Sequence, residues 1–253
     1  LDRAEDALRK LEGTEHEAQA LLALLAIYER TRDWAQASEV ARKLTDGGHG
    51  DFSGRLAHYL CEQAALATGS QAQALVRQAL QISPGAVRPG LELAALQMQA
   101  QDAAGAFDTL STLTDTAPQS MGLIARPLVE AAQACGRQAQ AARLLAAAQD
   151  AQASLDVLEA LVLVEADPQQ ARQRYVRHLE REPSLVVAAK WIAGEKLEHE
   201  QFHPLVQRSL DQAVKPLTRY RCAACGFEAN RHFWQCPGCQ AWDSYPARRV
   251  EEL

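Results

Sequence analysis

The sequence is short of several features on which common functions depend. Aromatic residues make up 6% of its 253 positions, so the body of the protein must pack its helices closely through small residues such as the abundant alanines. The apolar run at residues 21–27 is far too short to cross a bilayer, and we expect no secretory signal peptide. The net charge of −6 comes with no basic stripe, which argues against binding to nucleic acid.

Catalytic motifs are missing as well. The chain has no glycine-rich phosphate loop, no Gly-x-Ser-x-Gly and no His-Glu-x-x-His. The seven histidines are scattered, and we interpret His199 and His203, four residues apart, as a helix cap or a solvated pair. The adjacent Glu251 and Glu252 are interpreted as a solvated tail. We therefore predict no catalytic residues and no organic cofactor site, so the chain is not expected to be an enzyme.

Four of the six cysteines fall within eighteen residues near the end of the sequence. They form two Cys-x-x-Cys pairs separated by ten residues, and the predicted metal ligands are Cys222, Cys225, Cys236 and Cys239. Four thiolates at this spacing can close a tetrahedron around one metal ion. We expect each pair to form a tight turn and the intervening residues to form a short hairpin. Gly226 follows the first pair, where a Cβ would crowd the turn.

Other uses of these cysteines fit less well. Two disulfides would need an oxidising compartment, in which Cys61 and Cys135 would rarely remain as lone thiols; we interpret both as buried small hydrophobes. A thioredoxin-like pair would need a βαβ pattern, which is absent. Zinc is favoured by a closed four-sulfur site, and iron is the alternative because the pairs resemble the two knuckles of rubredoxins. His232 lies between the pairs and is not needed as a ligand.

Aromatic residues crowd the same segment: Tyr220, Phe227, Phe233, Trp234, Trp242 and Tyr245. One interpretation is that they pack around the metal site and against the preceding helix. A second is that some of them form a surface for a protein partner, and a third is that they stack on the bases of a single-stranded nucleic acid. Residues 218–253 contain five arginines against four acidic residues, so no nucleic-acid partner is expected.

A repeat of about 34 residues runs through the rest of the chain. Small residues recur at Ala4, Ala37, Ala72, Ala106, Ala141 and Ala171, at intervals of 33, 35, 34, 35 and 30. In three units a proline follows about twelve residues later, at Pro84, Pro118 and Pro183. Small residues let two antiparallel helices approach closely, and the proline ends the second helix. The period and the pattern are those of tetratricopeptide repeats.

The repeat predicts the helices and the domains. After a single helix at 1–13, helix pairs are expected at 15–46, 53–83, 87–117, 119–149 and 154–182, followed by an irregular capping pair at 185–193 and 203–214. The predicted fold is an all-α tetratricopeptide-repeat superhelix, a solenoid, over residues 1–217, with a rubredoxin-like zinc-ribbon module at 218–253. The link at residues 215–217 is too short to be free, so the module should dock on the last helices.

Repeats followed by these knuckles are an uncommon combination, and the chain resembles the lipopolysaccharide assembly protein B (LapB, YciM) family over essentially its whole length. The residues that carry the resemblance are Tyr220, Cys222, Cys225, Gly226, Phe227, Trp234, Cys236, Pro237, Cys239 and Trp242. The knuckle alone is less specific, because the zinc finger of the RadA recombination ATPase looks similar. That finger, however, precedes a P-loop ATPase, and this chain has repeats instead.

The resemblance implies a Gram-negative inner-membrane protein with an N-terminal transmembrane helix and a cytoplasmic body. It implies an adaptor that regulates lipopolysaccharide biosynthesis by promoting degradation of the deacetylase LpxC by the membrane protease FtsH. These two proteins, and other lipopolysaccharide assembly proteins, are the expected partners, and a homodimer is possible. Because the sequence begins inside a predicted helix, we expect a preceding segment. An iron-binding redox protein and a nucleic-acid-binding zinc ribbon stay open as alternatives.

Overall fold

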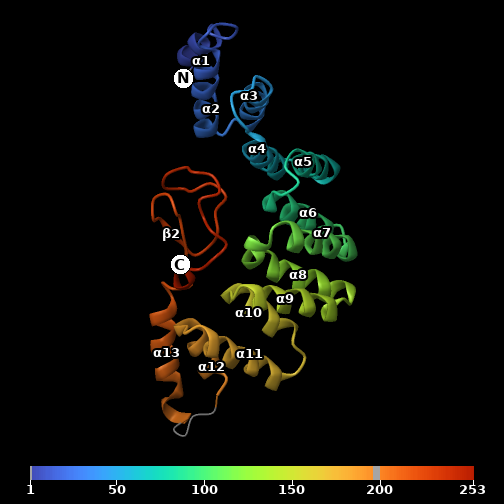
Figure 1. Cartoon of the computed structure of the whole chain (residues 1–253), viewed down its shortest axis with the longest axis vertical. Helices are drawn as coiled ribbons and strands as arrows, with labels where there is room; N and C mark the ends of the chain where they lie inside the picture. Colours follow the sequence, from blue (N-terminus) through green and yellow to red (C-terminus); the bar gives the residue numbers. More distant parts are fainter. Residues whose placement is uncertain (1, 196–199) are drawn as a thin grey trace. The chain divides into compact units, whose positions relative to one another are not determined.

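The computed structural model describes residues 2–195 and 200–253 and consists mainly of α-helices (Figure 1). It comprises two compact units, residues 1–96 and 97–253. Within the described residues, no helix combines the length and the apolar character that crossing a membrane requires. His199, one of the two histidines interpreted as a pair, lies outside the described residues.

The first unit contains a single helix and then helix pairs. Its elements are α1 (Asp2–Arg9), α2 (Glu17–Thr31), α3 (Trp34–Asp46), α4 (Ser53–Leu66), α5 (Gly69–Ile82) and most of α6 (Val87–Gln99). Helix α2 packs on α3, and α4 packs on α5. These bounds agree with the predicted pairs within a few residues.

The second unit continues the helix pairs and ends in the ribbon. Its helices are α7 (Ala103–Thr116), η1 (Pro118–Ser120), α8 (Met121–Cys135), α9 (Gln138–Ala151), α10 (Leu155–Val164), α11 (Pro168–Arg181), α12 (Leu185–Ala193), η2 (Glu200–Phe202) and α13 (His203–Val214). The ribbon contributes β1 (Tyr220–Arg221), β2 (Glu228–Ala229) and η3 (Val250–Glu252). The predicted fold class, tetratricopeptide-type helical repeats followed by a rubredoxin-like ribbon, is confirmed.

Two of the turns inside the pairs share one local design. Arg32 between α2 and α3 and Gln101 between α6 and α7 have positive φ angles of 58° and 62°. Each is followed by an aspartate whose carboxylate accepts a backbone N–H of the next helix, from Gln36 to Asp33 at 3.2 Å and from Gly105 to Asp102 at 2.9 Å. A left-handed residue ends one helix and an aspartate N-cap begins the next, which explains why short turns suffice.

The recurring small residues occupy the helix crossings in most repeats. The described ones that are buried are Ala37, Ala72, Ala106 and Ala141. Ala4 is exposed and Ala171 is half-buried, so the pattern weakens in α1 and α11. In the α4–α5 pair, Ala72 joins a small core with Ala64, Val76 and Leu93. Close approach through alanine therefore replaces bulky packing, as the composition predicts.

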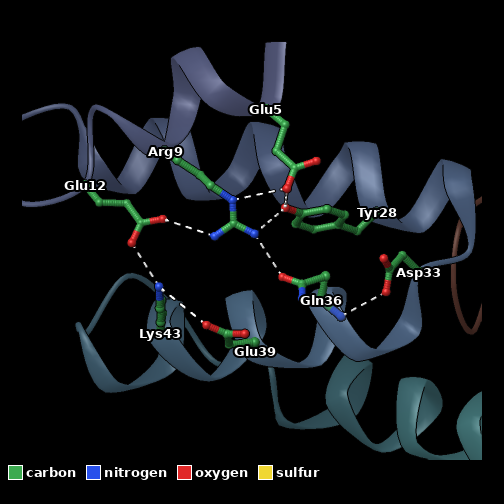
Figure 2. Close-up of polar contacts among 8 residues, drawn as sticks. All are labelled: Glu5, Arg9, Glu12, Tyr28, Asp33, Gln36, Glu39 and Lys43. Carbon is green, nitrogen blue, oxygen red and sulfur yellow. Dashed lines mark hydrogen bonds and ion pairs between the residues drawn. The ribbon is translucent and has the colours of Figure 1, made fainter. Parts of the chain in front are cut away.

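Helix α1 is fixed to the first full pair by a polar network (Figure 2). The Arg9 guanidinium donates to the Tyr28 hydroxyl and to the Gln36 side chain, both at 2.9 Å, and the Tyr28 hydroxyl donates to Glu5 at 2.6 Å. Lys43 of α3 pairs with Glu12 at 2.9 Å. Burial and the bond to Glu5 raise the pKa of Tyr28 to about 12, so the phenol stays a neutral donor. The network joins α1 to α2 and α3.

Ion pairs also link the first helices of successive pairs in this unit. Arg55 of α4 lies 3.7 Å from Glu29 of α2, and Arg88 of α6 lies 2.8 Å from Glu62 of α4. The two arginines are one repeat length apart in the sequence, and so are the two glutamates. Arg88 is buried and also pairs with Glu92 at 2.7 Å. The same contact is therefore made at two successive repeats of this unit.

Candidate metal centre

The four predicted cysteine ligands come together in the ribbon. All four sulfur atoms lie within 4.8 Å of one another, with Cys222 and Cys239 3.8 Å apart and Cys225 and Cys236 3.7 Å apart. A tetrahedral site with metal–sulfur bonds of about 2.3 Å has sulfur–sulfur edges of roughly 3.8 Å. The thiols thus fit one tetrahedral metal ion. Among the described residues, no other His, Cys, Asp and Glu side chains form such a group.

The first pair sits in the turn of a small hairpin. Strands β1 and β2 pair antiparallel, Tyr220 with Ala229, and the Cys-x-x-Cys turn connects them. The backbone N–H of Cys222 donates to the carbonyl of Phe227, and that of Gly226 donates back to the carbonyl of Cys222, both at 2.9 Å. Gly226 has φ +76°, a left-handed conformation that glycine adopts without cost.

The second pair repeats this geometry with different residues. A β-bridge joins Gln235 and Trp242, the N–H of Cys236 donates to the carbonyl of Ala241 at 2.9 Å, and the N–H of Gln240 donates to the carbonyl of Cys236 at 2.8 Å. Gln240 takes the place of Gly226 with φ +61°. The expectation of a hairpin between the two pairs was wrong. Each Cys-x-x-Cys pair instead forms the turn of its own hairpin. The residues before each turn pair with those after it, Tyr220 with Ala229 and Gln235 with Trp242.

Hydrogen bonds prepare the inner sulfurs to carry negative charge. Burial alone would raise the pKa of Cys222, but the Ser244 hydroxyl and the backbone N–H groups of Cys225 and Ala224 lower it to about 6. At Cys236 the N–H groups of Cys239 and Gly238 likewise outweigh burial and lower the pKa. The pKa of Cys225 is raised to about 12, where burial and the other thiols outweigh an N–H bond from Phe227. Four thiolates here therefore require a cation between them.

Aromatic side chains line the inner side of the metal site. Tyr220 and Tyr245 are buried with Cys222 and Cys236, and Leu123 of α8 packs against this group. The aromatic cluster therefore packs around the site, as one interpretation held, and it reaches α8. The Nε2–H group of His232 donates to the Tyr245 carbonyl oxygen at 2.9 Å, and the ring lies edge-on to Trp234, so its role is packing. Phe227 remains 44% exposed.

Beyond the knuckles, residues 247–252 form what we call the docking tail, which contacts the helical repeats. Its centre is Arg249, whose guanidinium makes two bonds to the Asp156 carboxylate of α10 at 2.6 and 2.8 Å. The same group donates to the Thr218 carbonyl at 2.8 Å and lies 4.0 Å above the Tyr220 ring. Arg249 therefore ties α10, the link after α13 and β1 together.

The two glutamates of the docking tail cap two helices. Glu251 accepts the Ser184 hydroxyl and the Leu185 N–H at the start of α12, both at 2.6 Å. Glu252 accepts the Leu155 N–H at the start of α10 at 2.9 Å, and burial raises its pKa. The interpretation as a solvated tail was wrong. Carboxylates are stabilised at helix N-termini, where backbone N–H groups lack partners.

A third helix touches the docking tail through a glycine. At Gly122, in the first turn of α8, an added Cβ would collide with the carbonyl oxygen of Ala247. The docking tail thus contacts the N-terminal ends of α8, α10 and α12, which are the first helices of three successive helix pairs. The expected docking on the last helices is confirmed and extends back to α8.

Cys61, Cys135 and His203 lie outside the metal site. Cys61 is fully buried, as expected, and burial raises the pKa of its thiol. Cys135 is only half-buried at the end of α8, so that prediction was wrong in degree. His203 begins α13, and its ring nitrogen lies 3.2 Å from the Ile192 carbonyl oxygen.

Sequence reasoning missed the residues that attach the ribbon. Asp156, Arg249, Glu251 and Glu252 carry no spacing signal, because their partners lie 66 to 97 residues away in the chain. A local hint is that Ser154 and Ser184 stand at helix starts. The first backbone N–H groups of a helix need acceptors, and a carboxylate from elsewhere in the chain can supply one.

Comparisons with known proteins agree with both parts of the chain. Residues 220–245 match the rubredoxin metal-binding domain model of the LapB zinc ribbon. Lipopolysaccharide assembly protein B of Escherichia coli (strain K12) is 27% identical over 266 aligned positions, which cover 100% of this chain and 68% of that protein. The Haemophilus influenzae protein of the same name is 26% identical, covering 96% of this chain and 64% of its own length.

Solved structures similar to this chain include two of MamA. A mutant of MamA has a TM-score of 0.41 at 15% identity and covers 66% of this chain and 98% of its own. A second MamA structure has a TM-score of 0.40 at 17% identity, covering 72% and 95%. The chain as a whole is similar to lipopolysaccharide assembly protein B, and the resemblance to that family predicted from its repeats and knuckles is confirmed.

Proposed function

We propose that the chain is a non-enzymatic adaptor in lipopolysaccharide assembly. Its helical repeats would bind protein partners, and its ribbon would hold the last repeats in their binding shape. The observation that carries the proposal is the docking tail, through which a four-cysteine module is attached to three repeat helices. A metal-binding module that rigidifies the last repeats would keep their binding surface in one shape, which suits a protein that acts by binding partners. The relatives named lipopolysaccharide assembly protein B align with 96–100% of this chain, across both the repeats and the ribbon.

The finer proposal follows the resemblance. The chain would be the cytoplasmic part of an inner-membrane protein and would promote degradation of LpxC by FtsH, contacting both through the repeats. Repeat arrays offer extended surfaces that suit such contacts, because neighbouring repeats present side chains along one continuous face.

The metal site itself is unsuited to catalysis. Four protein sulfurs complete a tetrahedron, which leaves no position open for water or a substrate. The site can therefore supply folding free energy, on the order of 10 kcal/mol for a structural zinc ion. In this reading, Cys222, Cys225, Cys236 and Cys239 hold the ion, Ser244 and the knuckle N–H groups stabilise the thiolates, and the docking tail passes the rigidity to the helices.

We assign zinc to this site. Zinc prefers a closed four-sulfur site. It has no redox chemistry, and a structural role requires none. Elemental analysis of protein purified without added metal tests the assignment. We expect one zinc per chain and four thiols protected from modification until a chelator is added.

The adaptor function is tested with purified proteins. We expect the chain to retain FtsH or LpxC in pull-downs at micromolar concentration, and a Cys236→Ser variant to lose that binding. Cys135→Ser is the matched control, because that thiol lies outside the metal site, and it should bind normally. Failure of the unaltered, metal-loaded chain to bind either protein would contradict the proposal.

An iron-binding redox protein is the second candidate, because the geometry of the site is compatible with either metal. Rubredoxin-type turns with N–H groups pointing at sulfur suit iron as well as zinc, and the sulfur–sulfur distances fit both. One iron per chain and visible absorption that disappears on reduction would move the function to electron transfer or redox sensing.

A further inference from the structure

A cavity of about 170 Å³ opens between α9, α10 and α11, away from the metal centre. Its apolar wall includes Ala146 of α9 with Leu158 and Leu161 of α10, and its polar wall is formed mainly by α11. A single water needs only about 10–15 Å³ of such space, so the cavity has room for a larger group.

Three arginines of α11 line this cavity, and two of them are neutralised. Arg174 makes two bonds to Glu165, at 2.8 and 3.1 Å, and Arg181 pairs with Asp150 at 3.3 Å. Arg177 is exposed and has no carboxylate partner among the described residues. The residues that line the cavity, counted with their ion-pair partners, therefore carry one net positive charge in a chain whose net charge is −6.

His178, which also lines the cavity, is held in one tautomer. The Ser154 N–H donates to Oε1 of Gln149 at 3.1 Å, which turns the amide nitrogen of Gln149 toward Nδ1 of His178 at 3.2 Å. Nδ1 therefore accepts, and Nε2 carries the hydrogen. Burial lowers the pKa of this histidine, so the ring is neutral near pH 7. Within the described residues, no acceptor for Nε2–H is seen, so it is available to an incoming group.

We propose that this cavity binds the carboxylate of a protein segment that ends in an apolar residue such as leucine. Arg177 supplies the charge, Nε2–H of His178 supplies a fixed donor, and the Ala146, Leu158 and Leu161 wall receives the apolar side chain. Arg181 shields the one carboxylate in the wall, Asp150, from the ligand. A neutral donor beside an arginine suits a carboxylate, because it binds the anion without adding a second buried charge.

The proposal goes beyond the adaptor function by naming the chemistry of a ligand. It rests on that function only in taking a protein segment as the source of the carboxylate. Its test uses the purified chain and small probes, so a negative result is independent of whether FtsH or LpxC binds.

The probe is N-acetyl-L-leucine, and its neutral amide, N-acetyl-L-leucinamide, is the matched comparison. Both are titrated to millimolar concentration into the isotope-labelled, metal-loaded chain while nuclear magnetic resonance follows the amides of residues 174–181 and the imidazole of His178. We expect saturable shifts at these positions with the carboxylate only. Arg177→Gln should weaken binding about tenfold, the size of one charge-assisted hydrogen bond. Arg143→Gln, an exposed arginine of α9 outside the cavity, should leave it unchanged.

Three outcomes would overturn the proposal. Equal shifts with the acid and the amide would show that the carboxylate is not recognised. Shifts with inorganic phosphate but not with N-acetyl-L-leucine would identify a free-anion site instead. An unchanged affinity in Arg177→Gln, with its spectrum otherwise native, would place the binding elsewhere.

Discussion

The knuckles at residues 220–245 and the docking tail at residues 247–252 hold the same module in place by different chemistry. The knuckles are local, since each Cys-x-x-Cys turn closes on itself, and the two are joined by the four-sulfur metal site and by short contacts such as the Ala223 N–H to the Ser244 carbonyl at 2.7 Å. The docking tail is non-local, since a guanidinium and two carboxylates reach helices far away in the chain. The metal shapes the module and the charges attach it, so damage to the attachment should leave the metal site intact, whereas loss of the metal should also loosen the attachment.

Removing the metal should have the largest effect. Cys236→Ser or a strong chelator should remove metal-binding free energy on the order of 10 kcal/mol and unfold the knuckles. Because the docking tail depends on the ribbon, hydrogen-exchange protection should also fall at the starts of α10 and α12, while residues 1–96 stay protected. Cys135→Ser should change neither. Protection that persists in α10 and α12 without metal would mean that the tail docks independently.

Breaking the arginine contact should come next. Arg249→Met removes both bonds to Asp156 and leaves that half-buried carboxylate without its cation, which should cost about 2–3 kcal/mol of unfolding free energy. Arg248→Met is the control, since its contacts to backbone carbonyls are 3.4 and 3.5 Å long, and it should cost less than about 1 kcal/mol. Metal content should remain at one ion per chain in both variants, and its loss in Arg249→Met would show that the two kinds of attachment are not separable.

Crowding the contact with α8 tests the third attachment. Gly122→Ala should force Ala247 away and cost about 1–3 kcal/mol, as overpacking does elsewhere. Gly54→Ala in α4 is the matched change, because nothing lies within 4 Å of its added Cβ, and it should be neutral or stabilising by up to about 1 kcal/mol. Thermal denaturation measures both, and equal effects would mean that α8 does not restrain the tail.

Removing one helix cap should have a moderate effect. Glu251→Ala leaves the Leu185 N–H and the Ser184 hydroxyl without an acceptor and should cost about 1–2 kcal/mol. Glu252→Ala should act in the same way on α10. Hydrogen exchange can assign each loss to its own helix. A fall in protection at both helices in either single variant would show that the tail detaches as one piece.

The smallest effects are expected from substitutions at the left-handed position of each knuckle, which should change metal affinity in opposite directions. Gln240→Gly should stabilise the second turn by about 1 kcal/mol, because a left-handed φ costs glutamine free energy that glycine avoids. Gly226→Ala places a side chain at the equivalent position and should destabilise the first turn by about the same amount. Chelator competition measures both through metal affinity. Shifts in the same direction would contradict the equivalence of the turns.

What the sequence could reveal follows from how local each signal is. The alanine period identified the helix pairs, because a crossing needs a small residue at a fixed place in each repeat. The cysteine spacing identified the metal site for the same reason, since each turn is closed within a few residues. The attachment of the ribbon was not predictable. Glu251 and Glu252 have the composition of a solvated end, and only the fold brings them to Leu185 and Leu155.

The Glu251 and Glu252 carboxylates, which cap α12 and α10 from far along the chain, also set an order of folding events during synthesis. Helix α10 waits for a carboxylate 97 residues further along the chain, and α12 waits for one 66 residues further along. At a translation rate of about 5–20 residues per second, α10 spends roughly 5–20 s without its cap on the ribosome. Until then the first turn of α10 lacks the Glu252 carboxylate that accepts the Leu155 N–H. The arrival of the ribbon, loaded with metal, is then the event that commits the C-terminal repeats to their final structure.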